Sequence, residues 1–220
     1  MADTDTGTAA KIASRSADAA PDRPGKRAQI IAGARRAFLA AGYEATSMSL
    51  VAREAGVSKG TLYVYFTNKE ALFAAVVEAV CRQPGDSVFD MLAGPGTAAE
   101  LLPAFGRRFV AFILSPQTHE LRWLVAAEAR KFPELGRGFY ETGPRQGTAR
   151  LAAFLKRRVE AGELDIDDTV LAASQFMGLC QAELGLMRQM NVIETATPQR
   201  IGYIVERAVQ LFLDGYRPHR

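Results

Sequence analysis

Apolar residues recur three or four positions apart along most of this chain, which is the spacing of one face of an α-helix. In the first such segment Ile30, Ala34 and Phe38 share a face, and Gly42 is expected to end the helix. Two short helical pieces follow, one on each side of Gly56. The pattern therefore predicts a group of three helices near the start of the chain.

A further helix is predicted over residues 68–81. Thr67 and Glu70 have the spacing of a capping box at its start. Pro84 and Gly85 are expected to close this segment, because proline lacks the backbone N–H that a helix interior needs.

The rest of the chain has the same helical spacing. Proline is tolerated in a first turn, so Pro103 places the start of the next helix near Leu101. Pro144 is expected to kink or split the region before it, and Thr197 fits the N-cap of the last helix. Other helices are expected between the prolines at 116 and 133, around 151–162, over 168–190 and over 198–215. No segment of appreciable length alternates as a strand does and no repeat is present, so the fold class is all-α with about nine helices.

Charges are distributed unevenly along the chain. The net charge is only +3 over 220 residues, which does not indicate a nucleic-acid partner. Residues 26–82, however, contain eight basic and four acidic side chains, whereas residues 83–220 contain sixteen of each. The basic excess therefore lies in one short block, which indicates a small anion-binding module attached to a neutral body.

Composition argues against several other classes of protein. Residues 1–24 are rich in Ala, Asp, Thr and Ser, which predicts a disordered arm with no secretory signal. No apolar stretch approaches the roughly 20 residues of a membrane span. Cys81 and Cys180 are expected to be buried free thiols. With only His119 and His219 besides, and both far apart, neither a metal site nor a cofactor is expected.

The most informative stretch is residues 47–66, where Ala52, Gly56 and Leu62 stand four and six positions apart. This spacing is typical of a helix-turn-helix. Ala52 must be small where the second helix crosses the first, and Gly56 can adopt the positive φ of the turn. Ser58 fits the N-cap of a second helix over about 59–66. The spacing alone also fits an ordinary αα-hairpin, but the basic block around it favours DNA binding.

The second helix of this motif is expected to project side chains that suit phosphates and base edges. These side chains are Lys59, Thr61, Tyr63 and Tyr65. Ser47 or Thr46 can cap the first helix and leave its N-terminal amides facing a phosphate. Lys69 starts the following helix beside the same surface. A plain packing helix would normally bury both tyrosines, which further favours DNA binding.

Residues 46–72 resemble the DNA-binding domain of the TetR/AcrR family; they read TSMSLVAREAGVSKGTLYVYFTNKEAL. The resemblance is close over about residues 24–84. It implies a dimeric transcription regulator, usually a repressor, that releases operator DNA when a small molecule binds. It also implies major-groove contacts from Lys59, Gly60, Thr61, Tyr63 and Tyr65, and backbone-phosphate contacts from Thr46, Ser47 and Lys69. Residues 122–140 resemble the AefR-like subgroup more loosely.

Three parts are thus expected: an arm over 1–24, a helix-turn-helix DNA-binding domain over 25–84, and a helical effector-binding and dimerisation domain over 85–220. The helix over 168–190 is apolar on two nearly opposite faces, so one face is expected against a second copy. Candidate dimer contacts are Leu179, Ala182, Leu186, Ile204 and Leu211. Candidate pocket residues are Phe105, Phe109, Arg122, Trp123, Glu128, Phe176 and Met177, each of which also fits a plain core or surface position.

The predicted function is a ligand-responsive transcriptional repressor in the cytoplasm, associated with the nucleoid. Its expected partners are a near-palindromic double-stranded operator, a second copy of the chain and an unidentified small-molecule effector, with no membrane. The alternative is an all-helical carrier or enzyme whose N-terminal hairpin is only structural. That alternative has little support, because the chain shows no catalytic His/Cys/Asp cluster, nucleophile elbow or phosphate-binding glycine loop.

Overall fold

Every element of secondary structure in the part of the chain that the structure describes is a helix. The structure is a computed structural model that describes residues 24–218, so the predicted arm lies outside it except for Pro24. The elements in chain order are α1 (Pro24–Ala45), α2 (Met48–Ala55), α3 (Lys59–Tyr65), α4 (Lys69–Asp90), the short 3₁₀ helix η1 (Met91–Ala93), α5 (Ala98–Leu114), α6 (Pro116–Glu128), α7 (Pro133–Thr142), α8 (Pro144–Glu160), α9 (Thr169–Gln189) and α10 (Pro198–Gly215). The all-α prediction is confirmed.

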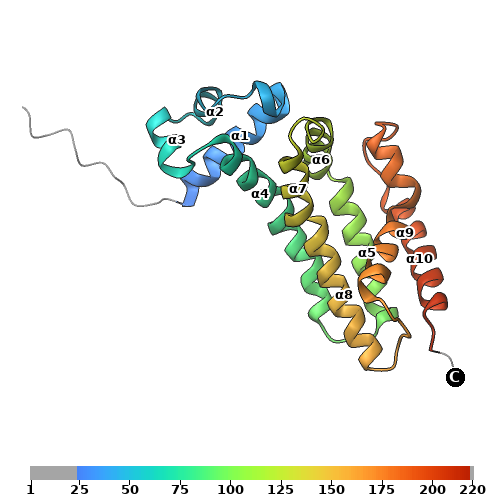
Figure 1. Cartoon of the computed structure of the whole chain (residues 1–220). Coiled ribbons are helices and arrows are strands. Elements are labelled where there is room, and N and C mark those ends of the chain that lie inside the picture. The colour runs from blue at the N-terminus through green and yellow to red at the C-terminus, as the bar shows by residue number, and fades with distance from the viewer. Residues whose placement is uncertain (1–23, 219–220) are drawn as a thin grey trace, which may run out of the picture.

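Helices α1, α2 and α3 form a group at one end of the molecule, and α4 leads from this group into a bundle of the later helices (Figure 1). Helix α1 is broken at Gly42, whose φ of 79° interrupts the helical conformation where the sequence predicted it. Pro144 begins α8 directly after Gly143, so it splits the region before it into α7 and α8. Helix α7 was not among the roughly nine helices that the sequence pattern predicted.

Two apolar clusters hold these helices together. One combines α1, α2, α3 and the first half of α4 with Leu121, Leu124 and Val125 of α6 and Leu135 of α7. The other is built mainly from α5, α8, α9 and α10, and the second half of α4 contributes Val88 and Phe89 to it. Helix α4 therefore belongs to both clusters, and α6 carries side chains of the later half of the chain into the N-terminal cluster.

The predicted end of α4 at Pro84 and Gly85 is wrong, because the helix continues to Asp90. A proline inside a helix removes one hydrogen bond and costs about 3 kcal/mol. Burial of Val88 and Phe89 beyond the proline offsets this cost. The predicted capping box at Thr67 is also replaced, because the side chain of Asn68 caps the helix and accepts a hydrogen bond from the Ala71 N–H at 2.8 Å.

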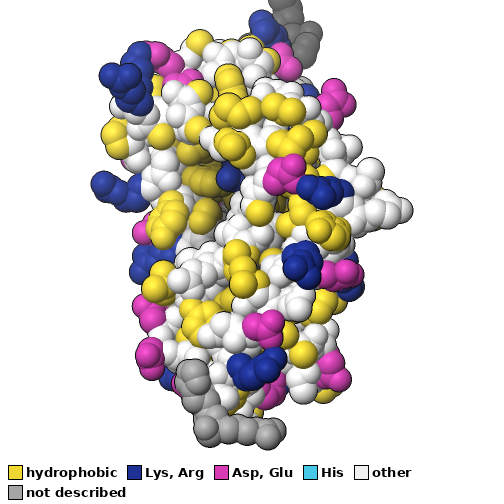
Figure 2. Space-filling model, turned by 90° about the vertical axis from the view of Figure 1, so that its right-hand side faces the viewer, with side chains coloured by type: hydrophobic (Ala, Val, Ile, Leu, Met, Phe, Trp, Pro, Cys, Tyr) yellow, Lys and Arg dark blue, Asp and Glu magenta, His cyan; other side chains and the backbone are white. Residues whose placement is uncertain are grey.

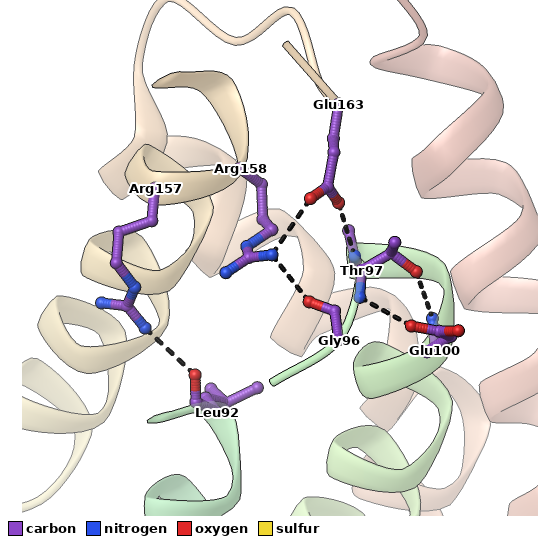
Figure 3. A network of polar contacts seen from close by, with 8 residues as sticks. Leu92, Gly96, Thr97, Glu100, Arg157, Arg158 and Glu163 are labelled. Atoms are coloured by element: carbon purple, nitrogen blue, oxygen red, sulfur yellow. Dashed lines mark hydrogen bonds and ion pairs between the residues drawn. The ribbon is translucent and has the colours of Figure 1, made fainter. Parts of the chain in front are cut away.

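The predicted start of α5 near Leu101 is wrong as well, since the helix begins at Ala98 and contains Pro103. Thr97 and Glu100 form a complete capping box, in which each side chain accepts a hydrogen bond from the other residue's backbone N–H (Figure 3). Two N–H groups that the first turn leaves unpaired are thereby satisfied. This stabilises the early start despite the proline.

A neighbouring ion pair reinforces the same helix start. Glu163, in the loop after α8, accepts a hydrogen bond from the Ala98 N–H at 2.8 Å and pairs with Arg158 at 3.0 Å. Arg158 also donates to the Gly96 carbonyl at 2.6 Å, so one network joins α8 to the start of α5 (Figure 3). The network lies far along the bundle from α3 in Figure 1 and has a structural role.

Helix α9 is, by length and composition, the one described helix that could span a membrane. It instead lies in the bundle, where Phe176, Cys180 and Leu184 are buried against neighbouring helices. The other side of α9 is largely exposed and includes the apolar residues Val170, Leu171 and Leu186. The conformation is non-helical at Ala182, so α9 is broken in its second half.

Candidate nucleic-acid interface and ligand cavity

The turn between α2 and α3 has the geometry that the sequence predicted. Gly56 has a φ of 64°, in the left-handed region that favours glycine. Ala52 and Leu62 are buried between the helices. Ser58 caps α3, because its Oγ accepts a hydrogen bond from the Thr61 N–H at 3.0 Å. These four positions hold α3 across α2, as in a helix-turn-helix.

Helix α3 presents a polar and aromatic face to solvent. Lys59 and Gly60 are exposed at its N-terminal end, and Tyr63 is 49% exposed. Val64 is 83% exposed and was missed as a candidate contact. The signal was available, since Val64 lies two positions from the buried Leu62 and therefore on the opposite side of the helix.

Nothing inside the protein requires a glycine at position 60. A Cβ added to Gly60 would have only the Oγ of Ser58 within 4 Å, at 3.8 Å, which is an ordinary contact distance. Glycine also weakens a helix relative to alanine. The absent side chain instead leaves room for another molecule to approach the backbone at the start of α3.

The N-terminus of α2 lies beside this face. Ser47 is exposed and caps α2 by accepting a hydrogen bond from the Leu50 N–H at 3.1 Å. Thr46 differs from the prediction, because its side chain is buried. Its hydroxyl donates to the carbonyls of Ala37 and Gly42. The Thr46 side chain therefore fastens the end of α1 and is not offered to a phosphate.

Two further residues that were predicted to contact DNA, Lys69 and Tyr65, already make contacts within the protein. The Lys69 ammonium donates to the carbonyls of Tyr43 and Glu44 at 2.9 and 3.2 Å and lies over the Tyr43 ring. Tyr65 is half-buried and packs against the N-terminal apolar cluster. The predicted residues that are exposed are therefore Lys59, Gly60, Tyr63 and Ser47. Thr61 is half-buried, and its hydroxyl lies within hydrogen-bond distance of the Ser58 Oγ at 2.8 Å.

A cavity of about 260 Å³ lies in the body among helices α4 to α9. Three of the pocket candidates, Phe109, Arg122 and Met177, line this cavity. Four other candidates do not: Phe105 and Phe176 are fully buried in the core, Trp123 is 57% exposed on the surface, and Glu128 faces α1. Helical spacing identifies which residues face inward, but it does not distinguish core from cavity wall.

Most of the cavity wall is apolar. Sequence reasoning missed its aromatic members Phe89, Phe112 and Phe139, which come from α4, α5 and α7. Cys81 also lines the cavity, and burial raises the pKa of its thiol to about 11. The thiol is thus neutral at physiological pH. Both cysteines are buried and free, as predicted.

Charged groups at the cavity differ in whether they have a partner. Arg150 pairs with Asp86 and Asp90 at 2.6 and 2.7 Å, and Arg82 pairs with Glu78. Arg122 has no hydrogen-bond or ion-pair partner among the described side chains. Arg122 is exposed as a residue, and partial desolvation by the cavity wall lowers the pKa of its guanidinium.

Helix α6 connects this cavity to the N-terminal helices. One side of α6 contributes Thr118 and Arg122 to the cavity. Three polar contacts fasten α6 and the residues after it to α1 and its C-terminal end: Arg35 with Glu120 at 2.7 Å, the Tyr43 N–H with Glu128 at 2.9 Å, and Lys131 with Glu44. A displacement of α6 would therefore pull on α1 through these contacts.

Helices α9 and α10 expose apolar side chains on the outer face of the bundle, where these lie among charged residues (Figure 2). Of the predicted dimer contacts, Leu186 and Leu211 are 63% and 61% exposed, and Ala182 is exposed. Leu179 is half-buried against the core. Ile204 differs from the prediction, because it is buried in the core cluster of the chain itself and not on this face.

Two family models match the chain. Residues 30–76 match "Bacterial regulatory proteins, tetR family", and residues 100–218 match "AefR-like transcriptional repressor, C-terminal domain". These ranges fall on the two groups of helices described above. Among the residues that the structure describes, no cluster of three or more His, Cys, Asp or Glu side chains could hold a metal ion.

Solved structures show the same architecture over most of the chain. The flavonoid-responsive regulator FrrA is 35% identical, with a TM-score of 0.77 over 90% of this chain and 100% of that one. A TetR-family regulator from Mesorhizobium loti is 31% identical, with a TM-score of 0.77 over 89% and 98%. The Bacillus subtilis regulator YhgD is 43% identical over 54 residues, which are 24% of this chain and 28% of YhgD. The chain therefore belongs to the TetR family of transcription regulators, which are DNA-binding proteins and not enzymes.

Proposed function

We propose that this protein is a transcriptional repressor that binds a near-palindromic operator as a dimer and releases it when a small molecule occupies the cavity. The observation that carries the proposal is the arrangement of α6, which lines the cavity on one side and is fastened to the DNA-binding helices on the other. The effector cavity and the DNA-binding surface then belong to one mechanical unit.

On the DNA side, α3 serves as the recognition helix. Lys59 and Ser47 supply groups that suit backbone phosphates, while Tyr63 and Val64 suit base edges and thymine methyl groups. The exposed backbone at Gly60 permits close contact with the groove. In a two-fold dimer the two α3 helices would occupy half-sites about 34–36 Å apart, one helical turn of DNA.

The second copy would pack against the exposed face of α9 and α10. Leu186 and Leu211 supply apolar area there. Gly178 and Gly202 have open space where a Cβ would stand, so helices of the partner can approach closely. Such an interface is isologous, and it sets the distance between the two recognition helices.

Release follows from a shift between two states of the dimer. A ligand that contacts Arg122 and Thr118 acts on α6, and α6 holds α1 through Glu128 and Glu120. A ligand shifts the equilibrium only by its difference in affinity for the two states. The effector would thus favour a state in which the spacing of the α3 helices no longer fits the operator.

A small-molecule effector is also supported by the relative FrrA, which is named as flavonoid-responsive. We assign residues 25–84 to DNA binding and residues 85–220 to effector binding and dimerisation, with α4 continuous across this division. As a regulator of chromosomal genes, the protein would act in the cytoplasm, on the nucleoid.

The test begins with sequencing of the genomic DNA that the purified protein retains, followed by anisotropy titration on that DNA. Lys59→Ala and Tyr63→Ala are expected to weaken binding at least tenfold without changing the melting temperature. Lys156→Ala removes one exposed lysine from α8, far from α3, and serves as the control. Affinity should also fall steeply with salt. Wild-type binding by both recognition-helix variants would refute the assignment of α3.

The sign of regulation is tested separately in cells. Deletion of the gene is expected to raise expression of a reporter placed behind the retained DNA, and complementation should lower it again. A fall in reporter expression on deletion would identify an activator and overturn the repressor assignment.

A further inference from the structure

The charge of the cavity wall is unbalanced at one position. Arg150 and Arg82 are each neutralised by carboxylates on α4. Arg122, from α6, has no such partner among the described side chains. Its ionisable neighbours Cys81 and His119 carry no negative charge at neutral pH, since burial raises the pKa of the Cys81 thiol. Within the described part of the chain, the Arg122 charge therefore has no carboxylate to balance it.

Arg122 is exposed to solvent and lines the cavity, so its guanidinium can pair with a ligand that enters there. The cavity wall removes part of the water around this group and lowers its pKa, and an ion pair formed there is stronger than one in open water. An arginine fork matches the two oxygens of a carboxylate through parallel N–H···O bonds. An anion in the cavity would supply the missing partner.

The rest of the wall specifies the remainder of the ligand. Phe89, Phe109, Phe112 and Phe139 place four phenyl rings around the cavity, together with the flexible thioether of Met177. The volume of about 260 Å³ lies just below the usual range of about 300–1,000 Å³ for ligand sites. Such a space suits a small ring system rather than a long acyl chain.

We propose that the effector cavity binds small aromatic carboxylates, with the ring system among the four phenylalanines and the carboxylate on Arg122. This inference rests on the proposed function and deepens it by naming the chemical class of the effector. It also gives Arg122 a second role. Since Arg122 lies on α6, two residues from the Glu120 that pairs with Arg35 of α1, the anion acts on the helix that holds the DNA-binding unit.

The experiment measures binding to the purified full-length protein by isothermal titration calorimetry. The probes are benzoate, 2-naphthoate and anthracene-2-carboxylate, each compared with its neutral carboxamide. The wild-type protein is expected to bind at least one acid ten or more times more tightly than the matching amide. Arg122→Gln is expected to abolish this preference while the amide affinity changes less than threefold.

Two controls separate charge from folding. Arg137→Gln removes an exposed arginine from α7 that does not line the cavity, and it should keep the preference for the acid. Arg122→Lys keeps a positive charge without the fork and should retain part of the preference. Melting curves of all variants verify that the fold is intact.

The proposal is overturned if no acid binds, if acid and amide bind equally to the wild type, or if Arg122→Gln keeps the preference. Operator binding by the ligand-free protein is measured independently. Loss of the acid preference with intact operator binding would refute the effector class alone. Acid binding by a protein that retains no DNA would instead refute the proposed regulatory function and leave the effector class standing.

Discussion

Glycine-to-alanine substitutions at Gly33 and Gly60 test two different properties. The first tests the packing of α1 against α2, and the second tests the approach of DNA to α3. At Gly33, in the middle of α1, an added Cβ would lie 2.5 Å from the Cα of Ala55 in α2. Ordinary Cβ contacts begin at 3.4 Å, so the helices would have to separate by about 0.9 Å. At Gly60 the same methyl group has 3.8 Å of space.

The expected magnitudes follow from these distances. Overpacking of a core typically costs 1–3 kcal/mol, about 2 kcal/mol being reasonable for Gly33→Ala because the obstructing atoms are backbone. For a chain of this size about 1 kcal/mol corresponds to 2–4 °C, so the melting temperature should fall by about 4–8 °C. Gly60→Ala should melt at or slightly above the wild-type temperature, since alanine is the better helix former by up to about 1 kcal/mol.

Below the melting temperatures, the variant expected to lose DNA binding is Gly60→Ala. Gly60→Ala is expected to lose at least tenfold in affinity, about 1.4 kcal/mol, because the methyl group obstructs the approach of α3 to the groove. The assays are thermal melting by circular dichroism and anisotropy titration on the retained genomic DNA. Wild-type affinity of Gly60→Ala would show that DNA does not approach this end of α3, and an unchanged melting temperature of Gly33→Ala would refute the packing argument.

Three other outcomes are expected. Leu186→Glu places a charge on the exposed α9 face and should shift the protein from dimer to monomer in light scattering; a persistent dimer would locate the interface elsewhere. Glu128→Ala leaves the part-buried Tyr43 N–H without its acceptor, at a cost of about 1–3 kcal/mol. Effector-induced DNA release should then weaken, and an unchanged release would exclude this contact from the coupling. Because burial raises the pKa of Cys81 from 9.0 to about 11, the thiol stabilises the fold fully below pH 9 and loses this contribution as the pH rises through 11. Iodoacetamide should therefore label Cys81 slowly at pH 8, and rapid labelling would contradict its burial.

The DNA-binding unit could be predicted closely because its determinants are local. Gly56 and Ser58 act on their own neighbours in the chain, through a left-handed φ and an N-cap hydrogen bond. Such local signals can be recognised from the sequence without knowledge of the tertiary structure. Thr46 shows the limit of this reasoning, because a threonine before a helix suits a cap equally well until the carbonyls of α1 are seen to accept its proton.

The cavity could be predicted only in part. Phe105 and Phe109 stand one helical turn apart on α5, yet one is core and the other wall. Which of them borders empty space depends on where α4 and α7 lie. The end of α4 could not be predicted for the same reason. Pro84 disfavours a helix locally, but Phe89 stabilises the helix by packing against residues that are distant in the chain.

By itself, the sequence determined the helical class, the helix-turn-helix and the block of positive charge, since each depends on residue type and on spacing within a few turns. Only the tertiary structure decided that α6 is shared between the cavity and the N-terminal helices, and that Arg122 has no carboxylate partner among the residues that the structure describes. The physical reason is that burial and pairing belong to groups far apart in the chain. The carboxylates of α4 pair with Arg82 and Arg150, while none is paired with Arg122. Only the packing of the helices decides which of these arginines a carboxylate can reach.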